Sequence, residues 1–427
     1  MNSPVVAFTF ASFLAMEAIA APMEGLLSKN SLWDFTQETF DPVALPLGFV
    51  WTTASCDSAR CGPQAGLTFG GLAVVEAVAW FSEGKMRELN ASLYTRGDVG
   101  NMERSEFEYL VKRSVDVVTG LTGAKPQMRG RDVRNAVKAE GIVWETERSE
   151  LRLEYAMTRV VTGQAITYRP EFLRLEISPL QKKQAGAKDP TFVNKQDMKS
   201  RVKRGEKGDV WLDGIPMVDQ GEKGYCLVAS AARVLRYYGM KVDQNELAQL
   251  AGSDSKRGTD LKSAQEGLRL AGNRLHFRVK TADEPDLRQF EVLVQDYNRR
   301  STKYGKGLQL PAPQGEIDPF QIMGEMRIEA LREVRMSQRA EMGRFLRSVV
   351  SSVEAGQPLI WGVALGLVQE TGLKQKAGGH VRMIVGYNSK TNEILYSDSW
   401  GAGHEMKRMR AGDAWLMHSF SLVLSPW

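Results

Sequence analysis

The segment 218–239 constrains the fold of this chain more than any other stretch. A glycine-punctuated loop ends at Cys226, and the following residues are good helix formers whose apolar side chains share one face: Val228, Ala231, Leu235 and Tyr238. Gly239 is typical of the residue at which a helix ends. The sequence therefore predicts that Cys226 begins a half-buried helix, whose partial positive charge stabilises a thiolate, the reactive form of cysteine.

Three polar residues qualify as partners of Cys226. Gln220 lies six residues upstream and can offer its side-chain amide to an oxyanion beside the sulfur. His380 follows two glycines and precedes an apolar run, which predicts the first position of a core strand. A second predicted strand, 393–397, leads to Asp398. A thiol, an imidazole that takes its proton and a carboxylate that orients the imidazole form the nucleophile–base–orienter set of acyl transfer.

Each of these residues also has a structural interpretation. Cysteine is among the most buried residue types, and an inert packing role is its usual one. Two other histidines are alternative candidates for the base. His276 is expected on the surface of a strand at 275–279, and His404 follows Asp398 closely in a loop expected to be exposed to solvent.

The order Gln220, Cys226, His380, Asp398 resembles the papain-like cysteine peptidases. The Gln–Cys spacing, the Gly-His-Val…Val-Gly-Tyr strand and the Asp-Ser-Trp-Gly turn carry the resemblance, which covers residues 210–427. Aspartate in place of asparagine, and Ala-Ser shortly after the cysteine, are more similar to the bacteriocin-leader-processing peptidases.

The resemblance implies an α+β fold in which the nucleophile helix packs on an antiparallel sheet. It implies hydrolysis of a peptide or protein substrate, with no metal or organic cofactor. Cys226 would attack the carbonyl, His380 would move the proton, and Asp398 would orient His380. Gln220 and the backbone N–H of Cys226 would bind the oxyanion. Trp400 would shield the His380–Asp398 hydrogen bond from water.

Two other functions stay open on the sequence. One is a cell-wall amidase or transpeptidase that uses the same residues. The other is a catalytically inactive, papain-like binding protein. Leu227 favours the inactive protein, because the families named above usually have a small residue directly after the cysteine.

Changes of composition predict the domain organisation. Residues 1–21 are expected to be a signal peptide, and residues 22–180 a lead-in followed by a smaller α+β domain. The lysine-rich segment 181–209 is expected to be an exposed linker, and residues 210–427 the peptidase domain. Within that domain, the charged and largely helical segment 286–355 is expected to be an insertion near the cleft.

Three details of the N-terminal half are predicted. Residues 25–65 are expected to be irregular, residues 72–81 to form one strand, and residues 103–121 to form an amphipathic helix. We expect this half to be a permanent accessory domain; the alternative is an inhibitory pro-region. The linker 181–209 is expected to be a solvated tether; the alternatives are a cleavage segment and a surface for anionic lipid or polymer.

Composition limits the partners and the compartment. The chain has 427 residues and a net charge of +5, which does not require a nucleic acid. After the N-terminal apolar run 5–16, no stretch is long and apolar enough to span a membrane. The apolar run predicts a secreted, periplasmic or cell-envelope protein. Cys56 and Cys61 are close enough for a disulfide in such a compartment, which would leave Cys226 as the odd thiol; the alternative is three unpaired cysteines.

Overall fold

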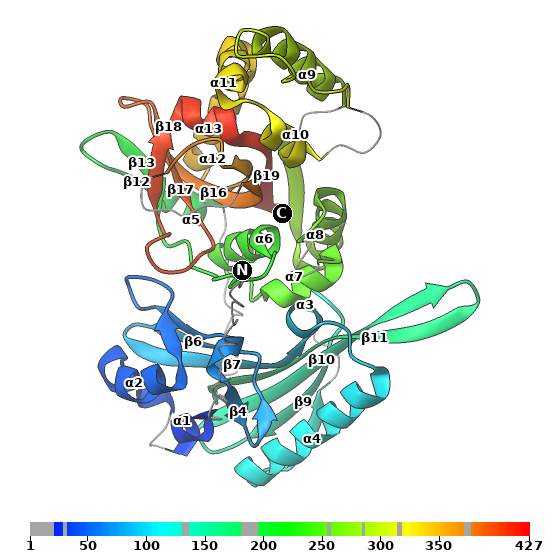
Figure 1. The fold of residues 1–427 in the computed structure, drawn as a ribbon. Coiled ribbons are helices and arrows are strands. Elements are labelled where there is room, and N and C mark those ends of the chain that lie inside the picture. The colour runs from blue at the N-terminus through cyan, green and yellow to red at the C-terminus, as the bar shows by residue number, and fades with distance from the viewer. Residues whose placement is uncertain are drawn as a thin grey trace, which may run out of the picture.

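A computed structural model of the chain describes residues 21–28, 32–129, 136–180, 195–253, 258–283, 287–313, 318–370 and 377–427. The expected signal peptide therefore lies outside the described residues, apart from Ala21. The chain mixes helices and strands. It forms two eight-stranded sheets, one below the other in Figure 1, and a small three-stranded sheet beside the first.

The first large sheet has the strand order β2-β3-β6-β7-β11-β10-β9-β8, and every neighbouring pair is antiparallel. Its strands are β2 (Phe49–Trp51), β3 (Ser58–Cys61), β6 (Glu76–Ser82), β7 (Lys85–Thr95), β8 (Gln127–Arg129), β9 (Glu140–Glu145), β10 (Ser149–Thr162) and β11 (Ala165–Pro179). The small sheet contains β1 (Ala21–Pro22), β4 (Leu67–Phe69) and β5 (Leu72–Ala73).

Helix α4 (Arg104–Thr122) lies across the first sheet, as Figure 1 shows, and it matches the amphipathic helix expected at 103–121. Its apolar face buries Phe107 and Val118 completely. Two expectations were wrong. Residues 72–81 form two strands that belong to different sheets. Residues 25–65 are not irregular, because they contain most of α1 (Glu24–Ser28), all of α2 (Gln37–Ala44) and strands β2 and β3. Aromatic side chains of this segment pack against one another and against β6.

The second large sheet has the order β12-β13-β16-β15-β19-β14, with β17 paired to β16 and β18 paired to β17. Its strands are β12 (Val202–Arg204), β13 (Asp209–Leu212), β14 (Phe277–Asp283), β15 (Leu359–Leu365), β16 (Gly378–Asn388), β17 (Glu393–Ser397), β18 (Lys407–Arg410) and β19 (His418–Pro426). All the pairs are antiparallel.

Helices cover both faces of the second sheet, which explains why its central strands are apolar at nearly every position. Alternate residues of β15 point to opposite faces. Ile360 packs in the cluster of α6 (Cys226–Tyr237), whereas Trp361 packs with the helices of the other face. The remaining helices are α3 (Arg96–Val99), α5 (Lys195–Ser200), α7 (Gln244–Ala251), α8 (Leu261–Leu275), α9 (Leu287–Ser301), α10 (Pro319–Glu325), α11 (Ile328–Ser337), α12 (Arg339–Glu354) and α13 (Ala411–Met417), together with short 3₁₀ turns.

Regular structure begins inside the segment expected to be a linker. Residues 181–194 lie outside the described residues, but residues 195–209 form α5 and β12 and begin β13. Met198, in this lysine-rich stretch, is buried in the core beside α6. Among the described residues, no helix is long and apolar enough to cross a membrane.

Candidate active site

Cys226 is the first residue of α6 and is partly exposed. As the first helical residue, it has a backbone N–H with no acceptor inside the helix. Leu227 points into the protein, since it is only 2% exposed and packs in the core cluster around α6. The bulky residue after Cys226 therefore occupies the protein core and not the space in front of the sulfur.

His380 and Asp398 meet at the edge of the sheet that faces α6. His380 is the third residue of β16, and Asp398 directly follows β17, the neighbouring strand. The Nε2 atom of His380 lies 2.6 Å from Oδ1 of Asp398. The side chain of His380 also has a hydrogen-bonding interaction with Cys226. Trp400 stacks on the imidazole, with ring centroids 4.5 Å apart; its shielding of the His380–Asp398 hydrogen bond stays a prediction.

The charges around His380 favour the imidazolium form. Burial by itself lowers the pKa of His380, but the charge and hydrogen bond of Asp398, together with Cys226, outweigh burial and raise this pKa to about 9. Burial of Asp398 acts to raise its pKa, and the charges of His380 and Arg382 reverse this, so that the net shift is downward. At neutral pH the pair is therefore an imidazolium beside a carboxylate.

Arg382 is a site residue that the sequence reasoning missed. Its side chain is fully buried, and its Nε donates to Oδ2 of Asp398 at 2.9 Å. Its Nη1 donates to Glu370 at 2.8 Å, and Glu370 also accepts from the hydroxyl of Tyr396. The signal was available, because residues 380 and 382 lie on the same face of a strand.

Arg233 is a second missed residue, and it connects the nucleophile helix to the strand that carries Asp398. It lies on α6, is 1% exposed, and donates to the backbone oxygen of Asp398 at 2.8 Å and to Oγ of Ser397 at 2.6 Å. Burial lowers its pKa to about 10, so the guanidinium stays charged at neutral pH. Nothing in the sequence distinguishes this arginine from a surface residue of the helix.

Gln220 lies in the same cluster. Its backbone N–H donates to the carbonyl of Ser399 at 2.9 Å, and its Oε1 accepts from the hydroxyl of Ser399 at 2.7 Å. Its Nε2 donates to the carbonyl of Lys223 at 2.9 Å, which leaves one amide hydrogen for another acceptor. The loop before Cys226 and the turn after Asp398 are thus tied together. The structure brings the four sequence-predicted residues into one site.

His276 and His404, the alternative candidates for the base, lie in surroundings that differ from those expected. His276 is not on a strand; it ends α8 in a left-handed conformation, with φ +58°, and β14 begins one residue later. His404 is half-buried and packs edge-on against Trp400, with ring centroids 5.5 Å apart.

The disulfide expected between Cys56 and Cys61 is not formed, and both cysteines are free. Cys61 is buried, and its thiol donates to the carbonyl of Leu47 at 3.2 Å. Burial raises the pKa of Cys61 to about 11, which makes this thiol unreactive. Cys56 is partly exposed and has a positive φ.

The comparisons with known proteins agree with a peptidase in the C-terminal part of the chain. Residues 322–421 match the model of the Peptidase_C39 like family. This match contains His380 and Asp398, and it begins after Gln220 and Cys226 in the chain. It begins in α10, so α11 and α12 fall inside it. No curated protein matches the chain.

Proposed function

We propose that this protein is a papain-like cysteine peptidase that hydrolyses peptide bonds with Cys226, His380, Asp398 and Gln220. The observation that carries the proposal is the position of His380, which interacts with Asp398 on one side and with Cys226 on the other. The family match to a C39-like cysteine peptidase supports it independently. So does the packing of a helix that begins at Cys226 against an antiparallel sheet.

The charges lead to a mechanism in which His380 acts first as an acid. The Cys226 thiolate forms a bond to the carbonyl carbon, and the negative charge moves to the carbonyl oxygen. The free amide hydrogen of Gln220 and the N–H of Cys226 stabilise that oxygen. As the C–N bond breaks, the proton of His380 passes to the leaving amine. Neutral His380 then takes a proton from water, whose oxygen attacks the thioester carbon. The C–S bond breaks, the acid is released, and the Cys226 thiolate is restored beside the His380 imidazolium.

The finer family assignment is part of the same proposal. Asp398, where papain has asparagine, supports a place near the bacteriocin-leader-processing group. The burial of Leu227 removes the main argument for an inactive binding protein. Export of the protein stays a proposal that rests on residues 1–21 alone, because the disulfide that would have supported it is absent.

An epoxide-type thiol-peptidase inhibitor tests this function. We expect it to label Cys226 alone, as mapped by mass spectrometry of peptides, and Cys226→Ala to abolish both labelling and hydrolysis of peptide substrates. Cys56→Ala is the matched control, because Cys56 is the other partly exposed thiol. This variant should keep full activity.

Gln220→Ala should lower kcat by about 10²–10³ if Gln220 is an oxyanion donor. Full turnover by Cys226→Ala would overturn the proposal. Labelling of Cys226 without hydrolysis of any peptide, but with cleavage of cell-wall peptide, would favour the amidase alternative.

A further inference from the structure

The loop that precedes Cys226 is held by the first sheet and not only by the sheet that carries His380. Lys223, three residues before the cysteine, has a side chain that is 5% exposed. Its Nζ lies 2.9 Å from Oδ2 of Asp98 and 3.6 Å from Oε2 of Glu76. Glu76 begins β6 of the first sheet, and Asp98 lies on α3; both come more than a hundred residues earlier in the chain.

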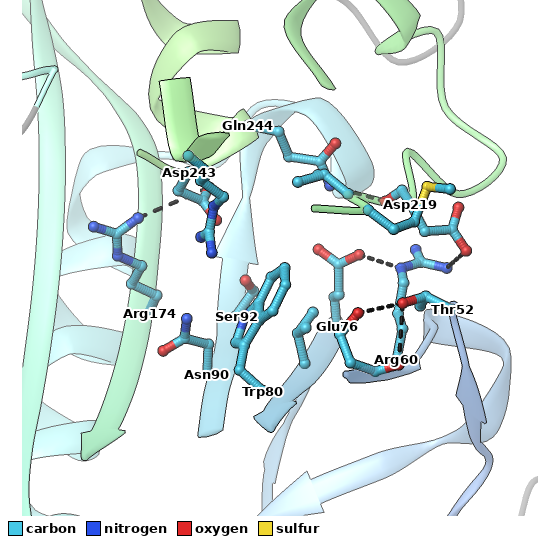
Figure 2. Close-up of a pocket in the computed structure, with 15 residues that line it drawn as sticks. Thr52, Arg60, Glu76, Trp80, Asn90, Ser92, Arg174, Asp219, Asp243 and Gln244 are labelled. Carbon is cyan, nitrogen blue, oxygen red and sulfur yellow. Dashed lines mark hydrogen bonds and ion pairs between the residues drawn. The ribbon is translucent and has the colours of Figure 1, made fainter. Parts of the chain in front are cut away.

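The other end of the same loop is held from the same sheet. Arg60 on β3 pairs with Glu76 and lies 4.0 Å from Asp219, so that it sits between the two carboxylates in Figure 2. Asp219 in turn accepts from the backbone N–H of Gly221 at 2.8 Å. Gly221 has φ +68°, and a Cβ at this position would overlap the Arg60 guanidinium. Both ends of the loop 219–223 thus form ion pairs with the N-terminal half of the chain: Asp219 pairs with Arg60, and Lys223 pairs with Glu76 and Asp98.

Lys223 is connected to the oxyanion donor through its own backbone. Its carbonyl accepts from Nε2 of Gln220 at 2.9 Å and from the backbone N–H of Tyr225 at 2.7 Å. Together with the Ser399 hydroxyl, which donates to Oε1 of Gln220, this carbonyl therefore determines where the second amide hydrogen of Gln220 points. A shift of about 1 Å in a positioned group is enough to cost a large part of catalysis.

We propose that Lys223 is a positioning residue of the active site, held by Glu76 and Asp98 so that its carbonyl aims Gln220 at the oxyanion. This inference rests on the proposed function. It makes the first sheet a component of the catalytic site. Buried ion pairs are poor stabilisers compared with apolar contacts, and fixing one geometry is the best-attested reason to keep them.

The cavity drawn in Figure 2 lies behind this loop and not in front of the sulfur. It has a volume of about 40 Å³, and it is lined by residues of both sheets' domains, among them Arg60, Glu76, Asp219 and Gln244. None of Cys226, His380 and Asp398 lines it. Its size suits buried water and excludes a peptide side chain of any length.

The test compares Lys223→Met with Lys241→Met in the full chain. Lys241 makes the same kind of contact between the two parts of the molecule, 3.2 Å from Glu88, but it is 73% exposed and lies beyond the end of α6. We expect Lys223→Met to lower kcat by about 10–100-fold, below the full loss of an oxyanion donor, with little change in KM. Lys241→Met should change kcat less than twofold. The rate of Cys226 alkylation should be unaffected in both, since Asp398 holds His380 independently.

A double variant separates positioning from general destabilisation. In a Gln220→Ala background, Lys223→Met should lower kcat no further, because both changes remove the same interaction. Losses that multiply, or equal losses from Lys223→Met and Lys241→Met, would overturn the proposal. If Lys223→Met does not fold, Asp98→Asn is the milder variant. In Asp98→Asn, Lys223 keeps its contact with Glu76, so the loss of kcat should be smaller than that expected for Lys223→Met.

Hydrogen exchange keeps the test independent of the proposed function. If the unmodified protein hydrolyses no peptide, the proposed function has failed, but the amides of residues 221–224 still report on the loop. They should exchange faster in Lys223→Met than in Lys241→Met if Glu76 and Asp98 hold the loop. Equal exchange in the two variants would refute the role of Lys223 by itself.

Discussion

At the scale of single residues, Asp398 is where the charges of the candidate site converge. Its Oδ1 accepts from His380 and from the backbone N–H of Ser399, and its Oδ2 accepts from Arg382. An ionised carboxylate that is 1% exposed needs such partners, since an unpaired buried charge is costly. Arg382 therefore lets Asp398 stay negative, and the negative Asp398 keeps His380 protonated.

The pH profile of the enzyme should reveal this raised pKa. The pKa of His380 is about 9, so the imidazolium persists through neutral pH and is lost as the pH rises through 9. We expect kcat/KM to fall on the alkaline side near pH 9. In Asp398→Asn, which removes the negative charge beside His380, this alkaline limb should move to lower pH. A peptide-hydrolysis assay across the pH range measures both.

Asp283→Asn provides the matched control for that profile. Asp283 lies 3.0 Å from His418, a second buried His–Asp pair in the same sheet. Its removal should leave the alkaline limb in place. An alkaline limb that is identical in Asp398→Asn and the unmodified protein would show that His380 is not the group that titrates.

At the scale of elements, α3 and the start of α6 are in direct contact. Gly97 on α3 lies so close to Tyr225 that a Cβ there would overlap the tyrosine hydroxyl. Glu246 on α7 makes a second contact, 2.6 Å from Arg174 of the first sheet and 2.9 Å from the backbone N–H of Ala136. The helices around Cys226 therefore contact the first sheet as well as their own.

Gly97→Ala should destabilise the protein through this contact. The added methyl group forces α3 away from Tyr225, and overpacking of this kind typically costs about 1–3 kcal/mol. Gly120→Ala is the matched control, because Gly120 lies inside α4 with open space around its Cα. It should stabilise by about 0.5–1 kcal/mol, the ordinary gain of alanine in a helix. Urea unfolding measures both, and a neutral Gly97→Ala would contradict the close packing.

At the scale of the whole molecule, the contacts between the two large sheets support a permanent accessory domain over a removable pro-region. Ion pairs from Arg60, Lys223, Arg174 and Lys241 all cross between the two parts. The pairs of Arg60 and Lys223 hold the loop before Cys226, and the cavity beside Arg60 and Asp219 is lined by none of Cys226, His380 and Asp398. An inhibitory segment, in contrast, has to occupy the space in front of the sulfur.

A cut between the two parts tests this arrangement in the folded protein. A specific protease site is inserted within 181–194, in the segment expected to be a solvated tether, and the chain is cut there after purification. We expect the two pieces to elute together in gel filtration and the peptidase activity to stay within about twofold, because the polar contacts between the parts persist after the cut. Release of the first 180 residues with a large rise in activity would instead identify them as a pro-region.

The local patterns of the sequence were enough to predict several elements. The apolar spacing after Cys226 predicted α6, the pattern at 103–121 predicted α4, and the strand at 393–397 is β17 with the same bounds. The order of Gln220, Cys226, His380 and Asp398 along the chain indicated a common site, because these residue types together supply the groups that acyl transfer needs. The signals for the helices and the strand are short-range, and each lies within a few residues of the element that it predicts.

Other features depended on tertiary structure. In the sequence, Arg233 and Lys223 are indistinguishable from ordinary charged residues. Only their burial beside carboxylates or carbonyls from distant segments gives them a role. The free Cys56 and Cys61 show the same limit, since spacing along the chain says that a disulfide can close but not that the backbone brings the two sulfurs together. A charge acquires its function from what surrounds it in the fold, and only the assembled sheets decide those surroundings.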